Sequence, residues 1–199
     1  MYFPCPQIER GPIMFRRIFL PAVVSVMFSS FAIFPASALP PRLSSASTMA
    51  YGDMEIMFAQ AMIPHHRQAI TMSWYTLKNS SNANVIGLAK KIIAAQKGEI
   101  AQMTSWIKSS GQSMTSSHSM GASGMLSPTQ LAQLKSLKGR AFDKSFLMAM
   151  VEHHAGALQM VSWISASTRS DVKVLAANIK KAQSTEIAAM KKMIIKLGK

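Results

Sequence analysis

Two histidine doublets framed by methionines are the residues of this chain best suited to chemistry. The pattern Met-x-x-His-His-x5-Met starts at Met62 and starts again at Met150, 88 positions later. Four of the five histidines lie in these doublets: His65, His66, His153 and His154. Imidazole nitrogen and thioether sulfur both bind soft or borderline transition metals, and thioether favours Cu(I). The duplicated pattern therefore predicts copper binding, with Cu(I) favoured, Cu(II) also admitted and silver as a mimic.

Helical spacing supports this interpretation. At about 100° per residue, each doublet shares one helix face with its methionines. Met62 and His66 are four residues apart and are able to bind one ion together, whereas His65 points slightly away and suits a second ion or a supporting role. Pro64 either kinks the helix beside the site or is a tolerated kink, because proline removes a backbone hydrogen bond.

A structural explanation competes for the isolated residues. A methionine stripe at helical spacing ordinarily packs a core, since methionine fills irregular gaps. We therefore assign core or surface roles to four methionines: Met54, Met57, Met148 and Met193. Adjacent histidines, duplicated on a methionine face, favour a metal instead.

The elements that position these residues are all expected to be helical. Periodicity predicts helices over 49–79, 83–108, 128–137, 140–167 and 171–197, and no segment alternates like a strand. The motif Gln-x-x-Glu-Ile-x-x-Met at Gln96 recurs at Gln183, so the second half repeats the first. Two hairpins, 49–108 and 127–197, predict an all-α, ferritin-like four-helix bundle over residues 49–199.

We also assign roles to two glutamates and to three tryptophans. Glu99 and Glu186 suit direct ligation, counter-charge for lysine, or a hydrogen bond to a ligating histidine, and we favour the hydrogen bond. The tryptophans are expected to anchor the core at the bundle ends: Trp74, Trp106 and Trp163.

The loop 111–126 carries soft ligands in a Ser/Gly background. These are Met114, His118, Met120 and Met125. Weak collection of Cu(I) or Ag(I) and a plain linker are equally compatible with this composition.

The N-terminus has the pattern of an export signal. Arg16 and Arg17 precede an apolar stretch, 18–34, and Ala36-Ser37-Ala38 fits a cleavage site. We expect residues 1–38 to be a cleaved signal peptide, with an uncleaved membrane anchor as the alternative and 39–48 as a flexible lead-in. Cys5 is the only cysteine, so the mature protein would have no thiolate ligand.

Charge narrows the choice of partners. The 199-residue chain has 22 basic and 8 acidic residues, a net charge of +14 that favours anionic surfaces. The basic residues are scattered over helix faces and accompany no nucleic-acid motif, so we expect no nucleic-acid binding. We expect membrane contact only through an uncleaved N-terminal segment.

The repeated Met-(Ile/Val)-x-His-His-x-x-Ala-(Ile/Leu)-x-Met motif, followed by Gln-x-x-Glu-Ile-x-x-Met, resembles the CopM-like family of exported ferritin-like four-helix bundles, a domain-of-unknown-function family. The resemblance spans residues 50–197. It implies copper and silver binding and a contribution to copper tolerance. By position it implies ten ligands: Met62, His65, His66, Met72, Met103, Met150, His153, His154, Met160 and Met190.

Three functions follow from these observations. The leading one is a non-enzymatic, periplasmic or secreted copper buffer or carrier, with metal ions and an exported carrier or efflux component as partners. A ferritin-like redox enzyme is the alternative, although the chain lacks the Glu-x-x-His motif of di-iron bundles. The third is a helical interaction module that binds no metal.

Overall fold

The computed structural model describes residues 50–115 and 123–198, and every regular element in these ranges is helical. These described residues belong to one compact unit that carries its own core. The elements are α1 (Asp53–Asn79), α2 (Ala83–Ser110), α3 (Pro128–Ser136), α4 (Gly139–Val161), the 3-10 turn η1 (Ser162–Ile164) and α5 (Ser170–Gly198). None of the helices in the described ranges is long and apolar enough to cross a membrane.

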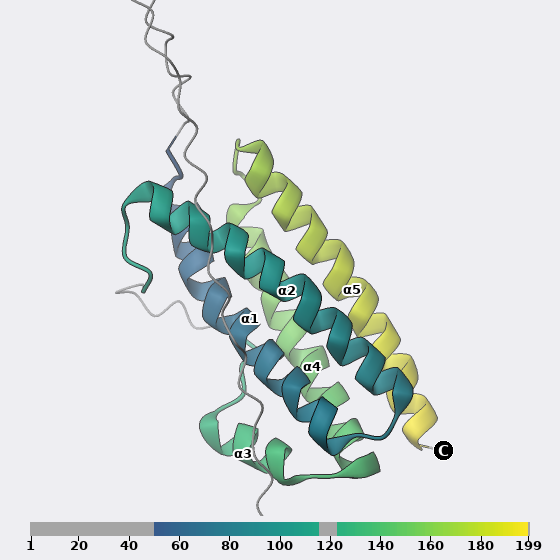
Figure 1. Ribbon diagram of the computed structural model, residues 1–199. Helices are drawn as coiled ribbons and strands as arrows, with labels where there is room; N and C mark the ends of the chain where they lie inside the picture. Colours follow the sequence, from purple (N-terminus) through teal and green to yellow (C-terminus); the bar gives the residue numbers. More distant parts are fainter. Residues whose placement is uncertain (1–49, 116–122, 199) are drawn as a thin grey trace, which may run out of the picture. The chain divides into compact units, whose positions relative to one another are not determined.

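The four long helices form two hairpins, which confirms the predicted four-helix bundle. Helix α1 packs along α2, and α4 packs along α5. The hairpins meet mainly through α1 and α4, while the short α3 covers one end of that pair (Figure 1). The helices that carry the histidine doublets therefore face each other at the centre of the bundle.

Turn chemistry sets the start of the second hairpin as the sequence predicts. The Ser127 hydroxyl accepts a hydrogen bond from the Gln130 amide at 3.2 Å, and the Gln130 side chain accepts one from the Ser127 amide at 2.8 Å. Pro128 occupies the first turn, where its missing N–H leaves no helical bond unmade. At the other turn, the Asn82 side chain caps α2 by accepting from the Asn84 amide.

Helix α4 is shorter than predicted. The α-helix ends at Val161 and tightens into η1 instead of continuing to residue 167. The Ser162 hydroxyl donates to the Gln159 carbonyl at 2.6 Å, and Ser165 and Ser167 follow in the same stretch. Serine side chains compete for backbone groups in this way, so the helix stops early.

Pro64 does not break α1, which runs through it from Asp53 to Asn79. Its ring is exposed, so the distortion that proline brings falls on the solvent side of the helix. The buried face that carries the first doublet is therefore continuous.

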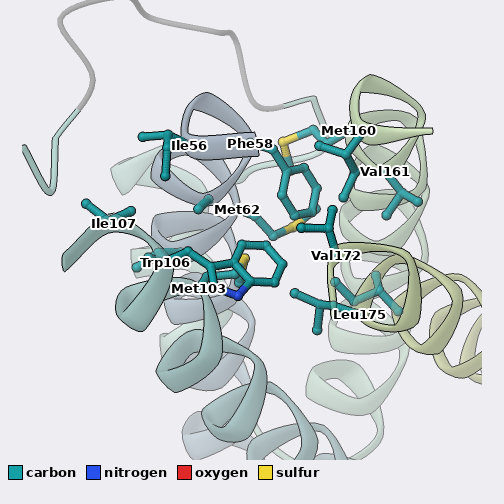
Figure 2. Packing of buried hydrophobic residues seen from close by; sticks show 14 of the residues in the cluster. Ile56, Phe58, Met62, Met103, Trp106, Ile107, Met160, Val161, Val172 and Leu175 are labelled. Atoms are coloured by element: carbon teal, nitrogen blue, oxygen red, sulfur yellow. The ribbon is translucent and has the colours of Figure 1, made fainter. Parts of the chain in front are cut away.

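Two hydrophobic clusters make up the core. We call them the Phe58 cluster, centred on Phe58, Met62 and Trp106 (Figure 2), and the Phe146 cluster, centred on Phe146, Met150 and Leu147. Each cluster draws side chains from both hairpins. The hairpins therefore stabilise each other by burying apolar surface jointly.

The tryptophan prediction is only partly correct. Trp106 is buried in the Phe58 cluster and Trp163 packs against it, whereas Trp74 is 47% exposed. Trp74 lies outside the α1 stripe that includes Met72 and Thr76, so it faces away from the core. The Lys97 ammonium lies over its ring, 5.8 Å from the centroid.

The segment 123–126 lies directly against the paired helices. Leu126 exchanges two backbone hydrogen bonds with the Gln68 side chain, at 2.7 and 2.9 Å. The backbone of Ser123 lies so close to Gly156 on α4 that a Cβ at Gly156 would be 1.8 Å from the Ser123 carbonyl oxygen. Gly124 has a φ of +83°, and a Cβ there would lie 2.3 Å from the Glu152 carbonyl oxygen. This contact needs glycine on both sides.

Substitution of Gly156 by alanine should therefore destabilise the protein by about 1–3 kcal/mol, because the 123–126 segment must move off α4. The matched control is Gly98→Ala on α2, where no atom lies within 4 Å of the new Cβ. That change should stabilise the protein by about 0.5–1 kcal/mol through helix propensity. Urea unfolding followed by circular dichroism measures both, and equal effects of the two substitutions would contradict the close approach.

Candidate metal centre

All four doublet histidines are buried where α1 meets α4. Their exposed fractions are 0% for His65, His66 and His154 and 1% for His153. The rings of His65 and His153 lie against each other, with centroids 3.8 Å apart and ring planes tilted by 41°. These two residues are equivalent in the repeat, so their contact marks the point about which the two hairpins are related.

The second histidine of each doublet is held by a glutamate from the other helix of its hairpin. The Glu99 carboxylate lies 2.7 Å from Nε2 of His66, and Glu186 lies 2.7 Å from Nε2 of His154. A carboxylate only accepts, so Nε2–H donates and Nδ1 is left unprotonated in the neutral ring. Neither Nδ1 has a hydrogen-bond partner. In its neutral form each ring thus presents an unprotonated nitrogen without a partner inside the bundle.

The first histidines are also left with unpartnered nitrogens. Nε2 of His65 donates to the Ser123 carbonyl at 3.2 Å, while its Nδ1 and both nitrogens of His153 have no partner. Burial lowers the pKa of His65 to about 4. Burial together with the neighbouring histidines lowers the pKa of His153 well below its usual value. Both rings are therefore neutral at pH 7, the form that binds metals.

Six of the predicted ligands are methionines, and all six are buried within the two core clusters. The Phe58 cluster contains Met62, Met103 and Met160, whose side chains lie around Phe58 and Trp106 (Figure 2). The Phe146 cluster contains the equivalent set, Met150, Met190 and Met72. Each set thus combines two methionines of one hairpin with one methionine of the other.

Helix geometry explains this exchange. Met160 follows His154 by six residues, which places it about 9 Å further along α4 and about 120° around it. Met62 precedes His66 by four residues and lies on the same side of α1. Because α1 and α4 run antiparallel, the methionine after one histidine doublet lies in the same cluster as the methionine before the other doublet. Met160 thus joins Met62, and Met72 joins Met150. Each cluster therefore contains methionines from both halves of the sequence, and not only from one repeat.

The same spacing links each glutamate to a methionine. Glu99 and Met103 are four residues apart on α2, and Glu186 and Met190 are four apart on α5. Since Glu99 binds His66, these side chains gather between α1 and α2, and the equivalent ones gather between α4 and α5. Each hairpin thus offers one imidazole and two thioethers, with a third thioether in the same cluster.

The other predicted ligands lie outside these sets. Met114 and Met125 are 39% and 37% exposed, whereas His118 and Met120 fall outside the described residues. Within the ranges that the structure describes, no three His, Cys, Asp or Glu side chains gather to hold a metal ion. The candidate centres therefore combine imidazole with thioether.

Two residues around the doublets escaped the sequence analysis, and two others were named there only as part of the repeat, without a role. Gln68 and Gly156 hold the 123–126 segment, and their roles depend on a chain approach that no local pattern shows. Gln96 and Gln183 are each 3% exposed and retain polar side-chain atoms without a hydrogen-bond partner. Their duplication in the repeat was the available signal.

The family model described as "Domain of unknown function (DUF305)" matches residues 55–194. The chain belongs to this family. Among curated proteins, none matches the sequence.

Solved structures of the family share the fold. A DUF305 protein of Streptomyces coelicolor, described as secreted, is 27% identical with a TM-score of 0.70, over 73% of this chain and 94% of that one. A DUF305 fragment from Deinococcus radiodurans is 29% identical with a TM-score of 0.66, over 73% and 97% of the two chains. CopM in its Cu(I)-bound form is 28% identical with a TM-score of 0.59, over 70% and 94%. CopM has also been solved with Cu(II) and with silver.

Proposed function

We propose that this protein is an exported, non-enzymatic copper-binding protein that holds Cu(I) in two equivalent centres and thereby contributes to copper tolerance. The observation that carries the proposal is the duplicated Glu–His hydrogen bond, which leaves Nδ1 of His66 and of His154 without a partner. The buried Met62 and Met150 lie one helical turn before these two histidines. The first centre comprises His66, Met62, Met103 and Met160. The second comprises His154, Met150, Met190 and Met72.

The charge of the first centre matches a monovalent ion. Thioether and neutral imidazole carry no charge, and Glu99 places one carboxylate 2.7 Å from Nε2 of His66. Transfer of an ion into a protein interior is unfavourable unless a counter-charge accompanies it. One carboxylate balances Cu(I) or Ag(I) fully and balances Cu(II) only by half. Ligand softness favours the same choice.

The relatives support this assignment. CopM, whose structures contain Cu(I), Cu(II) and silver, has the same fold over nearly its whole length. The Streptomyces coelicolor relative is described as secreted, which agrees with the export signal that we predict at residues 1–38. We therefore infer that the mature protein meets copper outside the cytoplasm and exchanges it with an exported carrier or efflux component.

The carboxylates argue against the redox enzyme. Glu99 accepts a hydrogen bond from a histidine of the first hairpin, and Glu186 accepts one from a histidine of the second. Glu55 is buried at the start of α1, where it accepts a hydrogen bond from the Gly52 amide at 2.7 Å. A di-iron centre needs several carboxylates around a shared metal pair. The positions of these glutamates favour copper storage or carriage.

Titration of residues 39–199 with Cu(I), in competition with a chromophoric chelator, should give two ions per chain. The variants His66→Ala and His154→Ala should each retain one ion, because each lacks one imidazole. Met62→Leu should also leave one ion per chain, and it removes the thioether without opening a large cavity. Circular dichroism checks that each variant is folded. Met54→Leu and Met148→Leu are matched controls at exposed positions and should retain two ions. Loss of all binding in either single histidine variant would instead indicate one shared centre.

The exchange of methionines between hairpins has its own test. In the His66→Ala background only the second centre remains, so Met72→Leu should weaken Cu(I) binding at least about tenfold, equivalent to about 1.4 kcal/mol. Met160→Leu should leave that affinity unchanged. In the His154→Ala background the two leucine substitutions should exchange their effects. The opposite pattern would assign each methionine to the doublet nearest in sequence.

A further inference from the structure

The basic residues of the described chain are unevenly divided between the two pairs of long helices. Helices α1 and α4 together carry four basic and four acidic residues, whereas α2 and α5 carry ten lysines and three acidic residues. The ten lysines are all exposed: Lys90, Lys91, Lys97, Lys108, Lys173, Lys180, Lys181, Lys191, Lys192 and Lys196. We call the exposed surface of these two helices, with its ten lysines, the α2–α5 face.

The three acidic residues of these helices are already bound. Glu99 and Glu186 accept hydrogen bonds from buried histidines, and Asp171 pairs with Arg169 at 3.1 Å. These three acidic residues therefore pair with groups other than the ten lysines. The α2–α5 face consequently presents a positive field along helices of 28 and 29 residues, each about 42 Å long.

The lysines occur on a surface that also exposes apolar side chains. Val174 is 57% exposed and Ile195 64% exposed, and both lie on α5 among the lysines. Trp74, half exposed beneath Lys97, lies beside α2. Helices that lie on membranes combine lysine with exposed aliphatic and tryptophan side chains in this way. Lysine also acts as a point charge rather than a bidentate phosphate clamp, which suits a surface of dispersed anionic groups.

We propose that the α2–α5 face docks the protein onto the surface of a membrane that contains anionic phospholipid. This goes beyond copper binding and departs from our sequence-based expectation that membrane contact involves only the N-terminal segment. Helices α2 and α5 flank a groove of about 510 Å³, lined among others by Lys91, Lys181 and Glu186. Docking in this orientation turns that groove, and with it the glutamate of the second copper centre, toward the membrane.

Co-sedimentation with lipid vesicles tests the proposal. Residues 39–199 contain the whole compact unit and exclude the apolar stretch 18–34, which would insert on its own. This protein should bind vesicles of equal parts phosphatidylglycerol and phosphatidylcholine, and should not bind phosphatidylcholine alone. Binding should fall steeply between 50 and 500 mM salt, because the Debye length shrinks from roughly 14 to 4 Å.

Matched variants separate the α2–α5 face from net charge. Substitution of Lys90, Lys97, Lys181 and Lys192 by Gln should weaken binding by roughly fivefold per lysine. The control removes the same charge from exposed residues on α1, α3 and α4 by substituting Arg67, Lys78, Lys135 and Lys144 by Gln, and it should retain most of the affinity. Both variants should keep their helical circular dichroism and their copper content, since none of these residues belongs to the copper centres.

Three results would overturn the proposal: no binding to anionic vesicles at 100 mM salt, equal losses in the two quadruple variants, or equal binding to neutral vesicles. Poly-L-glutamate serves as a further probe. If it binds in a manner that depends on the α2–α5 lysines while anionic vesicles do not, the face is specific for an acidic protein and the lipid proposal is wrong.

Discussion

The interior of this bundle depends on the hydrogen bond between a glutamate and the second histidine of each doublet. Burying an imidazole leaves its N–H in need of an acceptor, and Glu99 and Glu186 supply one from the neighbouring helix at 2.7 Å. The bond links the two helices of the hairpin. It also sets the tautomer, so that Nδ1 of His66 and of His154 is the free nitrogen. The chemistry that we propose depends on this choice.

The second constraint is the packing of α1 against α4. It brings the tilted rings of His65 and His153 together. It also places Met160 in the cluster that contains Met62, and Met72 in the cluster that contains Met150. A single hairpin therefore has an incomplete set of buried thioethers and half of each apolar cluster. The two halves of the repeat therefore form one unit, in which the contacts that stabilise the fold also bring together the proposed ligand sets.

Local patterns in the sequence predicted most of the fold. Helical periodicity placed α1, α2, α3 and α5 within about four residues at their ends, and the capping box at Ser127 was correct. The inward faces of the doublets also followed from spacing, and a hydrogen bond from a doublet histidine was the role favoured for Glu99, although the sequence did not say which histidine. Contacts that depend on how separate segments meet could not be predicted: the approach of Ser123 to Gly156, the clamp of Gln68 on Leu126 and the exchange of Met72 and Met160. Trp74 was misassigned because residue type was given more weight than its position on the helix.

In the proposed centres, each copper ion is bound by one imidazole and by thioethers from both hairpins. X-ray absorption spectroscopy of the Cu(I)-loaded protein tests this most directly, because scattering distinguishes sulfur from nitrogen neighbours. We predict a first coordination shell of one nitrogen and two or three sulfur atoms per copper. A shell made of nitrogen alone would place the metal on the paired rings of His65 and His153 instead, and would rule out the centres proposed at His66, His154 and the buried methionines.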